Sequence, residues 1–264
     1  MSGKASLPMY DLPELRAHTD ALWRAIAREL RSEGVPGVPD DLERGPSLDA
    51  LWSDPELLFT QTCGYPLTHA FAGRLRVVAT PRYAAPGCDG AMYRSFIVVA
   101  RDSPARDVAD LRGARAAVND ETSHSGALAL RAHVASLGSG APFFGETLVT
   151  GSHLASLERV AGGEADVAAI DCVTHALMSR ARPELIARTR VIARTLEAPS
   201  LPYATRADAS DELVAALQRA LRRALGTDAL APAGAARAAL LLESIELLPE
   251  SAYDRILEIE RAAR

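Results

Sequence analysis

The chain of 264 residues contains no run of about 18 apolar residues, the length that a membrane-spanning helix requires. We therefore expect no transmembrane helix. The segment from Met1 to Leu30 also lacks a basic region followed by an apolar core, so the sequence predicts no secretion signal. If Met1 is the native start, this absence predicts a cytoplasmic protein.

Cysteine is scarce, with Cys63, Cys88 and Cys172 as the only three. They show no CxxC spacing and no histidine at zinc-finger distance, so we expect no structural zinc site. No other metal and no cofactor is expected either. Cys63 and Cys88 both fall in turn-like segments, and the sequence leaves open whether they form a disulfide.

Positive charge is also limited, because Lys4 is the only lysine and the net charge is −5. The arginine-rich segments 180–194 and 219–223 alternate with apolar positions, as solvated helix or strand faces do. This pattern argues against a nucleic-acid partner. The chain further lacks the GxxxxGK[ST], HExxH and GxSxG sequences of common catalytic sites.

The sequence does contain a regular alternation of strands and helices, which predicts an α/β fold with parallel strands and crossover helices. After Ala100, strands are predicted at 114–118, 146–150 and 165–170, each followed by a helical pattern. This α/β block lies between two flanking segments. We predict a discontinuous first lobe, residues 1–99 plus 197–264, and an inserted second lobe, residues 100–196. The crossings at 96–100 and 191–196 would then be paired hinge strands.

Within this block, the stretch from Asn119 to Gly126 lies between an apolar strand and the start of a helical pattern. A helix start presents unpaired backbone N–H groups and the positive end of the macrodipole, and here Thr122, Ser123 and Ser125 add hydroxyl groups. This combination is suited to an oxyanion. The alternative is an ordinary helix cap, in which one serine satisfies the helix end.

The other strands of the block also end at polar residues. Ser152 and His153 follow one strand, and Asp171 follows the next. Since ligands bind at the carboxyl ends of strands in open α/β sheets, we expect these residues to gather with Ser123 and Ser125 at one edge. Capping of the following helices is the alternative role for His153 and Asp171.

A series of motifs, in order along the chain, resembles the solute-binding components of ABC-type phosphate, phosphite and phosphonate importers. The resemblance covers roughly residues 7–201 and implies a two-lobed, type II periplasmic-binding-protein-like fold, with an anion in a cleft between the lobes and two hinge crossings. The matching segments are Phe59-Thr60-Gln61-Thr62, Tyr93-Arg94-Ser95, Leu111-Arg112-Gly113, Asn119-Asp120, Ser123-x-Ser125-Gly126, Gly151-Ser152-His153, and Gly163-Glu164-Ala165-Asp166 leading to Asp171.

The sequence departs from the family pattern between the two serines, where Thr is frequent and this chain has His124. A bulkier, titratable group there would crowd or recharge an anion pocket. The missing secretion signal is a second departure, because an importer component implies a periplasmic location. The predicted ligand-binding residues are Tyr10, Gln61, Thr62, Tyr93, Ser123, His124, Ser125, Gly126, His153 and Asp171.

The favoured function is therefore binding without catalysis, with a small anionic ligand and an ABC transporter membrane component as partners. One alternative is an enzyme on the same fold, with Cys63 as a nucleophile at a helix start and His153 or His124 as base. An intracellular ligand-sensing protein is the other alternative.

Overall fold

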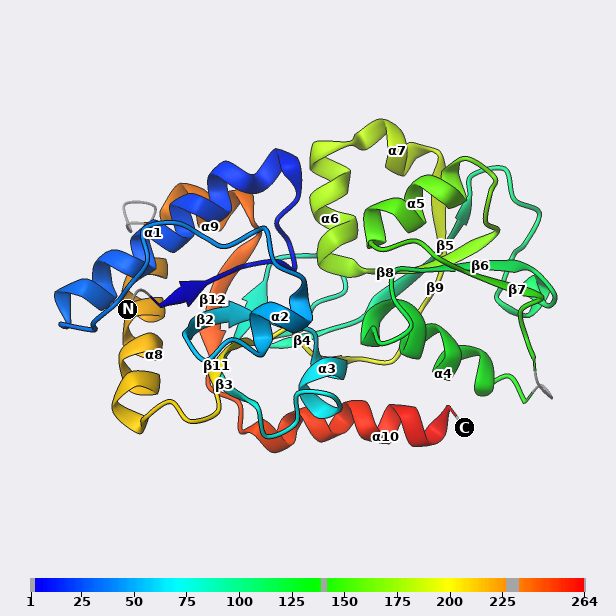
Figure 1. Ribbon diagram of the computed structural model, residues 1–264. Coiled ribbons are helices and arrows are strands. Elements are labelled where there is room, and N and C mark those ends of the chain that lie inside the picture. The colour runs from blue at the N-terminus through cyan, green and yellow to red at the C-terminus, as the bar shows by residue number, and fades with distance from the viewer. Residues whose placement is uncertain (1–2, 139–141, 227–232, 264) are drawn as a thin grey trace. The chain divides into compact units, whose positions relative to one another are not determined.

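The computed structural model describes residues 3–138, 142–226 and 233–263, and they form two compact units. Unit 1 comprises residues 1–84 and 199–252, and unit 2 comprises residues 85–198 and 253–264. Figure 1 labels helices and strands of both units where there is room.

Unit 1 is built on a five-stranded sheet in the order β1-β2-β11-β3-β12. β1 and β2 run parallel, and the other neighbours are antiparallel. The strands are β1 (Lys4–Ala5), β2 (Leu57–Gln61), β3 (Leu75–Tyr83), β11 (Tyr203–Arg206) and β12 (Leu242–Glu246). The helices are η1 (Pro13–Leu15), α1 (Arg16–Ser32), α2 (Leu48–Trp52), α3 (Gly64–Thr68), α8 (Asp211–Leu225) and α9 (Gly234–Ala239).

The core of unit 1 contains a stack of aromatic rings between helix and sheet. Phe59 on β2 lies between Trp23 of α1 and Tyr203 of β11, with ring centroids 5.8 Å and 5.3 Å away. All three side chains are buried. Large rings of this kind remove much apolar area from water, so they hold α1 against the sheet.

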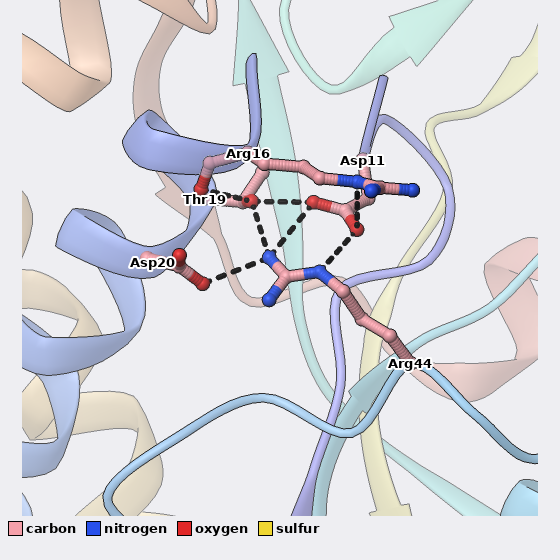
Figure 2. A network of polar contacts seen from close by, with 5 residues as sticks. All are labelled: Asp11, Arg16, Thr19, Asp20 and Arg44. Carbon is pink, nitrogen blue, oxygen red and sulfur yellow. Dashed lines mark hydrogen bonds and ion pairs between the residues drawn. The ribbon is translucent and has the colours of Figure 1, made fainter. Parts of the chain in front are cut away.

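A polar network around Arg44 ties the loop after α1 to the start of that helix (Figure 2). The Arg44 guanidinium donates to both carboxylate oxygens of Asp11 at 2.6 and 3.0 Å, and it pairs with Asp20 at 2.8 Å. Thr19 donates to Asp11 at 2.6 Å, and Arg16 lies 3.8 Å from the same carboxylate. The network therefore holds the segment that follows Tyr10.

Unit 2 is built on a second five-stranded sheet, in the order β7-β6-β8-β5-β9. β6 runs parallel to β7 and β8, whereas β5 is antiparallel to β8 and β9. The strands are β5 (Ser95–Ala100), β6 (Arg115–Val118), β7 (Glu146–Val149), β8 (Val167–Asp171) and β9 (Thr189–Arg194), with the short strand β4 (Met92–Tyr93) preceding them. The helices are η2 (Ala109–Leu111), η3 (His124–Leu128), α4 (Ala129–Ala135), α5 (His153–Ala161), α6 (Cys172–Ala181), α7 (Pro183–Ala187) and α10 (Asp254–Ala262).

The central strands of this sheet are buried on both faces, as expected when helices cover both sides. Figure 1 shows α4 on one side of the sheet and α5 on the other. On the α4 side, Ile97, Val99 and Val167 form a cluster with Leu130 and Val134. This packing positions the loops at the ends of β6 and β8.

The unit boundaries differ from the predicted ones, which were placed at 99/100 and 196/197. The chain passes between the units at 84/85, 198/199 and 252/253. β5 belongs wholly to unit 2 because it pairs on both sides, so its residues 96–100 are not a crossing. α10 returns to unit 2, where it contacts α4 and η3. β10 (Ala198–Pro199) and η4 (Glu250–Tyr253) lie at two of the boundaries.

The strands predicted at 114–118, 146–150 and 165–170 are present as β6, β7 and β8, with bounds that differ by one or two residues. β1 is limited to Lys4–Ala5, and Pro8 shortly after it has no N–H to donate to a ladder. β12 was not among the strands that the sequence predicted. Among the described residues, no helix has both the length and the apolar composition to cross a membrane.

Candidate functional site

The carboxyl ends of the parallel strands in unit 2 carry the polar residues that the sequence pointed to. Asn119 follows β6, Ser152 and His153 begin α5 after β7, and Asp171 ends β8. β6 lies between β7 and β8, so these three strand ends are neighbours at the same edge. Ser95 joins them, because it starts the antiparallel strand β5 directly opposite Asp171.

Ser123, Ser125 and His153 form a hydrogen-bonded cluster at this edge. Ser125 Oγ lies 2.8 Å from His153 Nε2 and 3.5 Å from Ser123 Oγ. The Ser125 carbonyl accepts a bond of 2.8 Å from the Ser95 hydroxyl. Both serines of the cluster are buried. The expected meeting of the residues after β6 and β7 is thus confirmed.

The two serines have different local roles. Ser123 is the N-cap of η3, a π-helical turn that leads into α4, and its Oγ accepts a bond of 3.2 Å from the Gly126 N–H. Ser125 makes no such cap bond and instead contacts His153 from the next strand end. Capping is therefore sufficient to explain Ser123 but not Ser125.

His124 is buried, with 2% of its surface exposed. Its Nδ1 has no hydrogen-bond partner among the described residues. The Tyr93 ring lies beside it, with centroids 6.1 Å apart. Burial lowers the pKa of His124 to about 4, since a charged imidazole loses its hydration there.

His153 is also held neutral, because burial lowers its pKa to about 4, and its Nδ1 has no hydrogen-bond partner among the described residues. The imidazoles of His124 and His153 are accordingly uncharged at neutral pH. An anion at the cluster would meet hydroxyl, N–H and neutral imidazole groups. Such neutral donors recognise an anion through directed hydrogen bonds rather than through net charge.

Gly126 permits a close approach between the start of η3 and the loop after β6. A Cβ atom at Gly126 would lie 1.8 Å from Asn119 Oδ1. The Asn119 oxygen is itself buried and has no hydrogen-bond partner in the described part of the chain. Glycine at position 126 therefore has a steric reason, and ligand binding by Gly126 stays a prediction.

Asp171 is buried and caps α6. Its Oδ1 accepts bonds of 2.7 and 2.9 Å from the backbone N–H groups of Val173 and Thr174. These contacts correspond to the capping role that the sequence left open. Ligand binding by Asp171 stays a prediction.

The predicted ligand residues Tyr10, Gln61 and Thr62 lie in unit 1. Gln61 ends β2, and its side-chain Nε2 donates to the Tyr83 hydroxyl at 3.1 Å and to the Leu201 carbonyl at 3.0 Å. The Tyr10 ring packs edge-on against Tyr83 at 5.3 Å. Thr62 is buried and donates to the Cys63 carbonyl at 3.2 Å. Tyr83 thus joins Tyr10 to Gln61, whereas Thr62 makes its bonds to backbone.

Two participants were missed by the sequence prediction. Ser95 was part of a matching motif but was not predicted as a site residue, and its hydroxyl donates to the Ser125 carbonyl. Tyr83 ends β3 and organises the unit 1 residues. The only signal for Ser95 in the sequence was its place in the Tyr93-Arg94-Ser95 motif, because it starts β5 and only the antiparallel direction of that strand brings it to the edge where β8 ends at Asp171. No comparable signal marked Tyr83.

The cysteines are not disulfide-bonded in the described residues. Cys63 is buried at the N-cap of α3 in unit 1. Cys88 belongs to unit 2, where its neighbour is Cys172. In the described ranges, no group of three or more histidine, cysteine or acidic side chains is arranged to hold a metal ion.

Comparison with known proteins gives the family. Residues 54–243 match the model of the family described as the periplasmic substrate-binding protein of the phosphonate ABC transporter. The chain belongs to this family. The family's members are substrate-binding proteins, not enzymes, so the predicted absence of catalysis is supported and the Cys63 alternative is set aside. No curated protein matches the sequence.

Solved structures of this type share the fold at low sequence identity. PhnD1 from Prochlorococcus marinus, in complex with methylphosphonate, has a TM-score of 0.78 and 15% identity over 98% of this chain and 97% of that chain. The binding protein PA3383 of an ABC phosphonate transporter from Pseudomonas aeruginosa has a TM-score of 0.77 and 18% identity over 99% and 86%. XAC2383 from Xanthomonas citri, bound to chloride ion, has a TM-score of 0.74 and 17% identity over 99% and 97%. The predicted two-lobed periplasmic-binding-protein-like fold is confirmed.

Proposed function

We propose that this member of the phosphonate-binding family binds a small oxyanion, namely phosphate, phosphite or a phosphonate, at the cluster of Ser123, Ser125 and His153. The observation that carries the proposal is the 2.8 Å contact between Ser125 Oγ and His153 Nε2, which joins two neighbouring strand ends in unit 2. Ligands of open α/β sheets bind at such strand ends.

The chemistry of the cluster supports an anion. When His153 Nε2 carries the proton, it donates to Ser125 Oγ and leaves the hydroxyl proton for the ligand. The first N–H groups of η3 and the helix dipole of η3 and α4 add to these donors. Tyr10, Gln61 and Thr62 of unit 1, together with Tyr93, His124, Gly126 and Asp171 of unit 2, are the further ligand residues of the proposal.

The proposed role is delivery of this anion to the membrane component of an ABC-type uptake system, with the protein in the periplasm. Membership of the family supports this partner and this location. The methylphosphonate complex of PhnD1 supports a phosphonate as the first ligand to examine.

A thermal-shift screen tests the ligand class with phosphate, phosphite, methylphosphonate, aminoalkylphosphonates, sulfate and small carboxylates. A ligand at 100 times its dissociation constant stabilises the folded state by about 2.7 kcal/mol, which raises Tm by roughly 5–10 °C for a protein of this size. A flat response to all phosphorus oxyanions would contradict the proposal.

Two serine variants then test the site. Ser125→Ala removes a hydrogen bond to a charged group, worth about 1.5–3 kcal/mol, so titration calorimetry should show affinity lower by roughly ten- to a hundredfold. Ser123→Ala removes a cap, so it should lower the free energy of unfolding by about 1 kcal/mol. Ser210→Ala removes the cap of α8 in unit 1 and serves as the matched control. Unchanged affinity in Ser125→Ala would exclude the proposed cluster.

A further inference from the structure

Cys88 and Cys172 lie next to each other in unit 2 although they are far apart in the sequence. Their Sγ atoms are 3.6 Å apart, and both are free thiols. Two sulfur atoms at this separation are in van der Waals contact. A disulfide requires about 2.05 Å, so the two atoms need to approach by only about 1.5 Å.

The backbone turn that contains Cys88 brings its thiol close to Cys172. Cys88 is in a tight turn in which its N–H donates to the Ala85 carbonyl at 3.0 Å. Gly87 in that turn has a φ of +101°, and a Cβ atom there would lie 3.0 Å from Cys172 Cβ and from the Phe96 ring. Only glycine lets the turn come this close to α6.

The position of Cys172 is fixed by the start of helix α6. Cys172 is the first residue of α6, directly after Asp171, which caps the helix. Its N–H donates to the Arg94 carbonyl at 3.1 Å. The two thiols are therefore in contact because the turn at 85–88 packs against the start of α6.

The two thiols differ in access. Cys172 is fully buried, whereas Cys88 is half-buried. The hydrogen bond with Cys88, burial and the charge of Asp171 all raise the pKa of the Cys172 thiol. The thiolate is the reactive form, so an oxidant from solution reacts first at Cys88.

We propose that Cys88 and Cys172 are an oxidisable dithiol, which a small disulfide such as oxidised glutathione converts into an intramolecular disulfide. Cys88 loses its proton to solvent, and its thiolate attacks one glutathione sulfur, breaking that disulfide and releasing one glutathione thiolate. Cys172 then loses its proton, and its thiolate attacks Cys88 Sγ and releases the second glutathione. The protein gives up two protons and two electrons, and oxidised glutathione becomes two thiols. The bond ties the turn at 85–88 to the first residue of α6.

The test treats the whole chain with oxidised glutathione at pH 8, removes the reagent, denatures the protein and counts free thiols. Of the three thiols, only that of Cys63 should remain free. The mass of the oxidised protein should be lower than that of the reduced protein by two hydrogen atoms. A peptide pair containing Cys88 and Cys172 should be recovered from a digest. Closing so long a loop should raise Tm by about 5 °C or more, and a reductant should reverse the rise.

The third cysteine provides a matched control. Cys63→Ser should show the same rise in Tm and no free thiol after oxidation, whereas Cys88→Ser should show no rise. Three free thiols after treatment, a stable glutathione adduct on Cys88, or a disulfide that includes Cys63 would each overturn the proposal. The result does not depend on the ligand, so it stands apart from the proposed anion site.

Discussion

At the scale of single residues, the unusual feature of the candidate site is a buried histidine between two serines. His124 lies between Ser123 and Ser125, and its Nδ1 has no hydrogen-bond partner among the described residues. A neutral imidazole is tolerated at this place, but a charged one is costly. Protonation of His124 at low pH should therefore lower the free energy of unfolding.

The first prediction concerns this pH dependence. The pKa of His124 falls from 6.5 to about 4 on folding, so between these values the unfolded chain binds more protons than the folded one. Stability from this group is complete above pH 6.5 and is lost as pH falls toward 4. The loss at pH 5 is about 2 kcal/mol. Urea unfolding at pH 7.5 and pH 5 measures it.

Protonation of His153 also lowers the free energy of unfolding in acid, because its pKa is lowered as well. The variant His124→Asn separates the contribution of His124 from that of His153. The difference in unfolding free energy between pH 7.5 and pH 5 should be smaller by about 2 kcal/mol in this variant. From pH 7.5 to pH 9 both imidazoles are neutral in both states, and wild type and variant should have the same slope. An unchanged acid loss in His124→Asn would contradict the assignment.

At the scale of elements, the sheet and its helices position the candidate residues, and polar networks hold the connecting loops. Arg44 is the centre of such a network, with hydrogen bonds to Asp11 as the main cause of its raised pKa. The Asp11 side chain is only 12% exposed. Loss of Arg44 would leave this carboxylate short of partners.

We expect Arg44→Ala to lower the free energy of unfolding by about 1–2 kcal/mol, a value reduced from that of a buried pair because the Arg44 side chain is 30% exposed. Arg255→Ala is the matched control, since Arg255 pairs with Glu258 on the surface of α10 and the two side chains are 40% and 53% exposed. That change should cost less than about 0.5 kcal/mol. Equal losses in the two variants would show that the network adds nothing beyond a surface pair.

At the scale of the whole molecule, the chain passes between the two units three times, and the last passage adds α10 to unit 2. α10 contacts α4 and η3, the segment that carries Ser125. Ile256 and Ile259 of α10 are buried. The C-terminal helix is thus part of the support of the candidate site.

Ile256→Ala should lower the free energy of unfolding by about 2–5 kcal/mol, the usual cost of such a cavity in a core. Leu247→Ala is the control, because Leu247 is 42% exposed and should cost less than about 0.5 kcal/mol. Urea unfolding of both variants gives the comparison. A loss in Ile256→Ala no larger than in Leu247→Ala would show that α10 does not stabilise the fold.

Local sequence determined much of the secondary structure and the main candidate stretch. The apolar strand before Asn119, the hydroxyl groups after it and the helical pattern that follows are adjacent in the chain, so short-range rules predicted their arrangement. The same rules predicted β6, β7 and β8. They did not reveal that η3 is π-helical, because the difference from an α-helix lies in backbone hydrogen bonds.

The sequence predicted that Ser125 and His153 would lie at one edge of the sheet, but tertiary structure decided the particular contacts between distant residues. Ser125 and His153 are 28 residues apart, and Cys88 and Cys172 are 84 apart. Their contacts depend on the order β7-β6-β8-β5-β9 and on the direction of β5, which no local pattern encodes. The return of α10 to unit 2 is of the same kind, since its apolar face can be read from the sequence but the surface that it covers cannot. Burial then gave His124 and His153 their lowered pKa values, because desolvation arises from neighbours contributed by the whole fold.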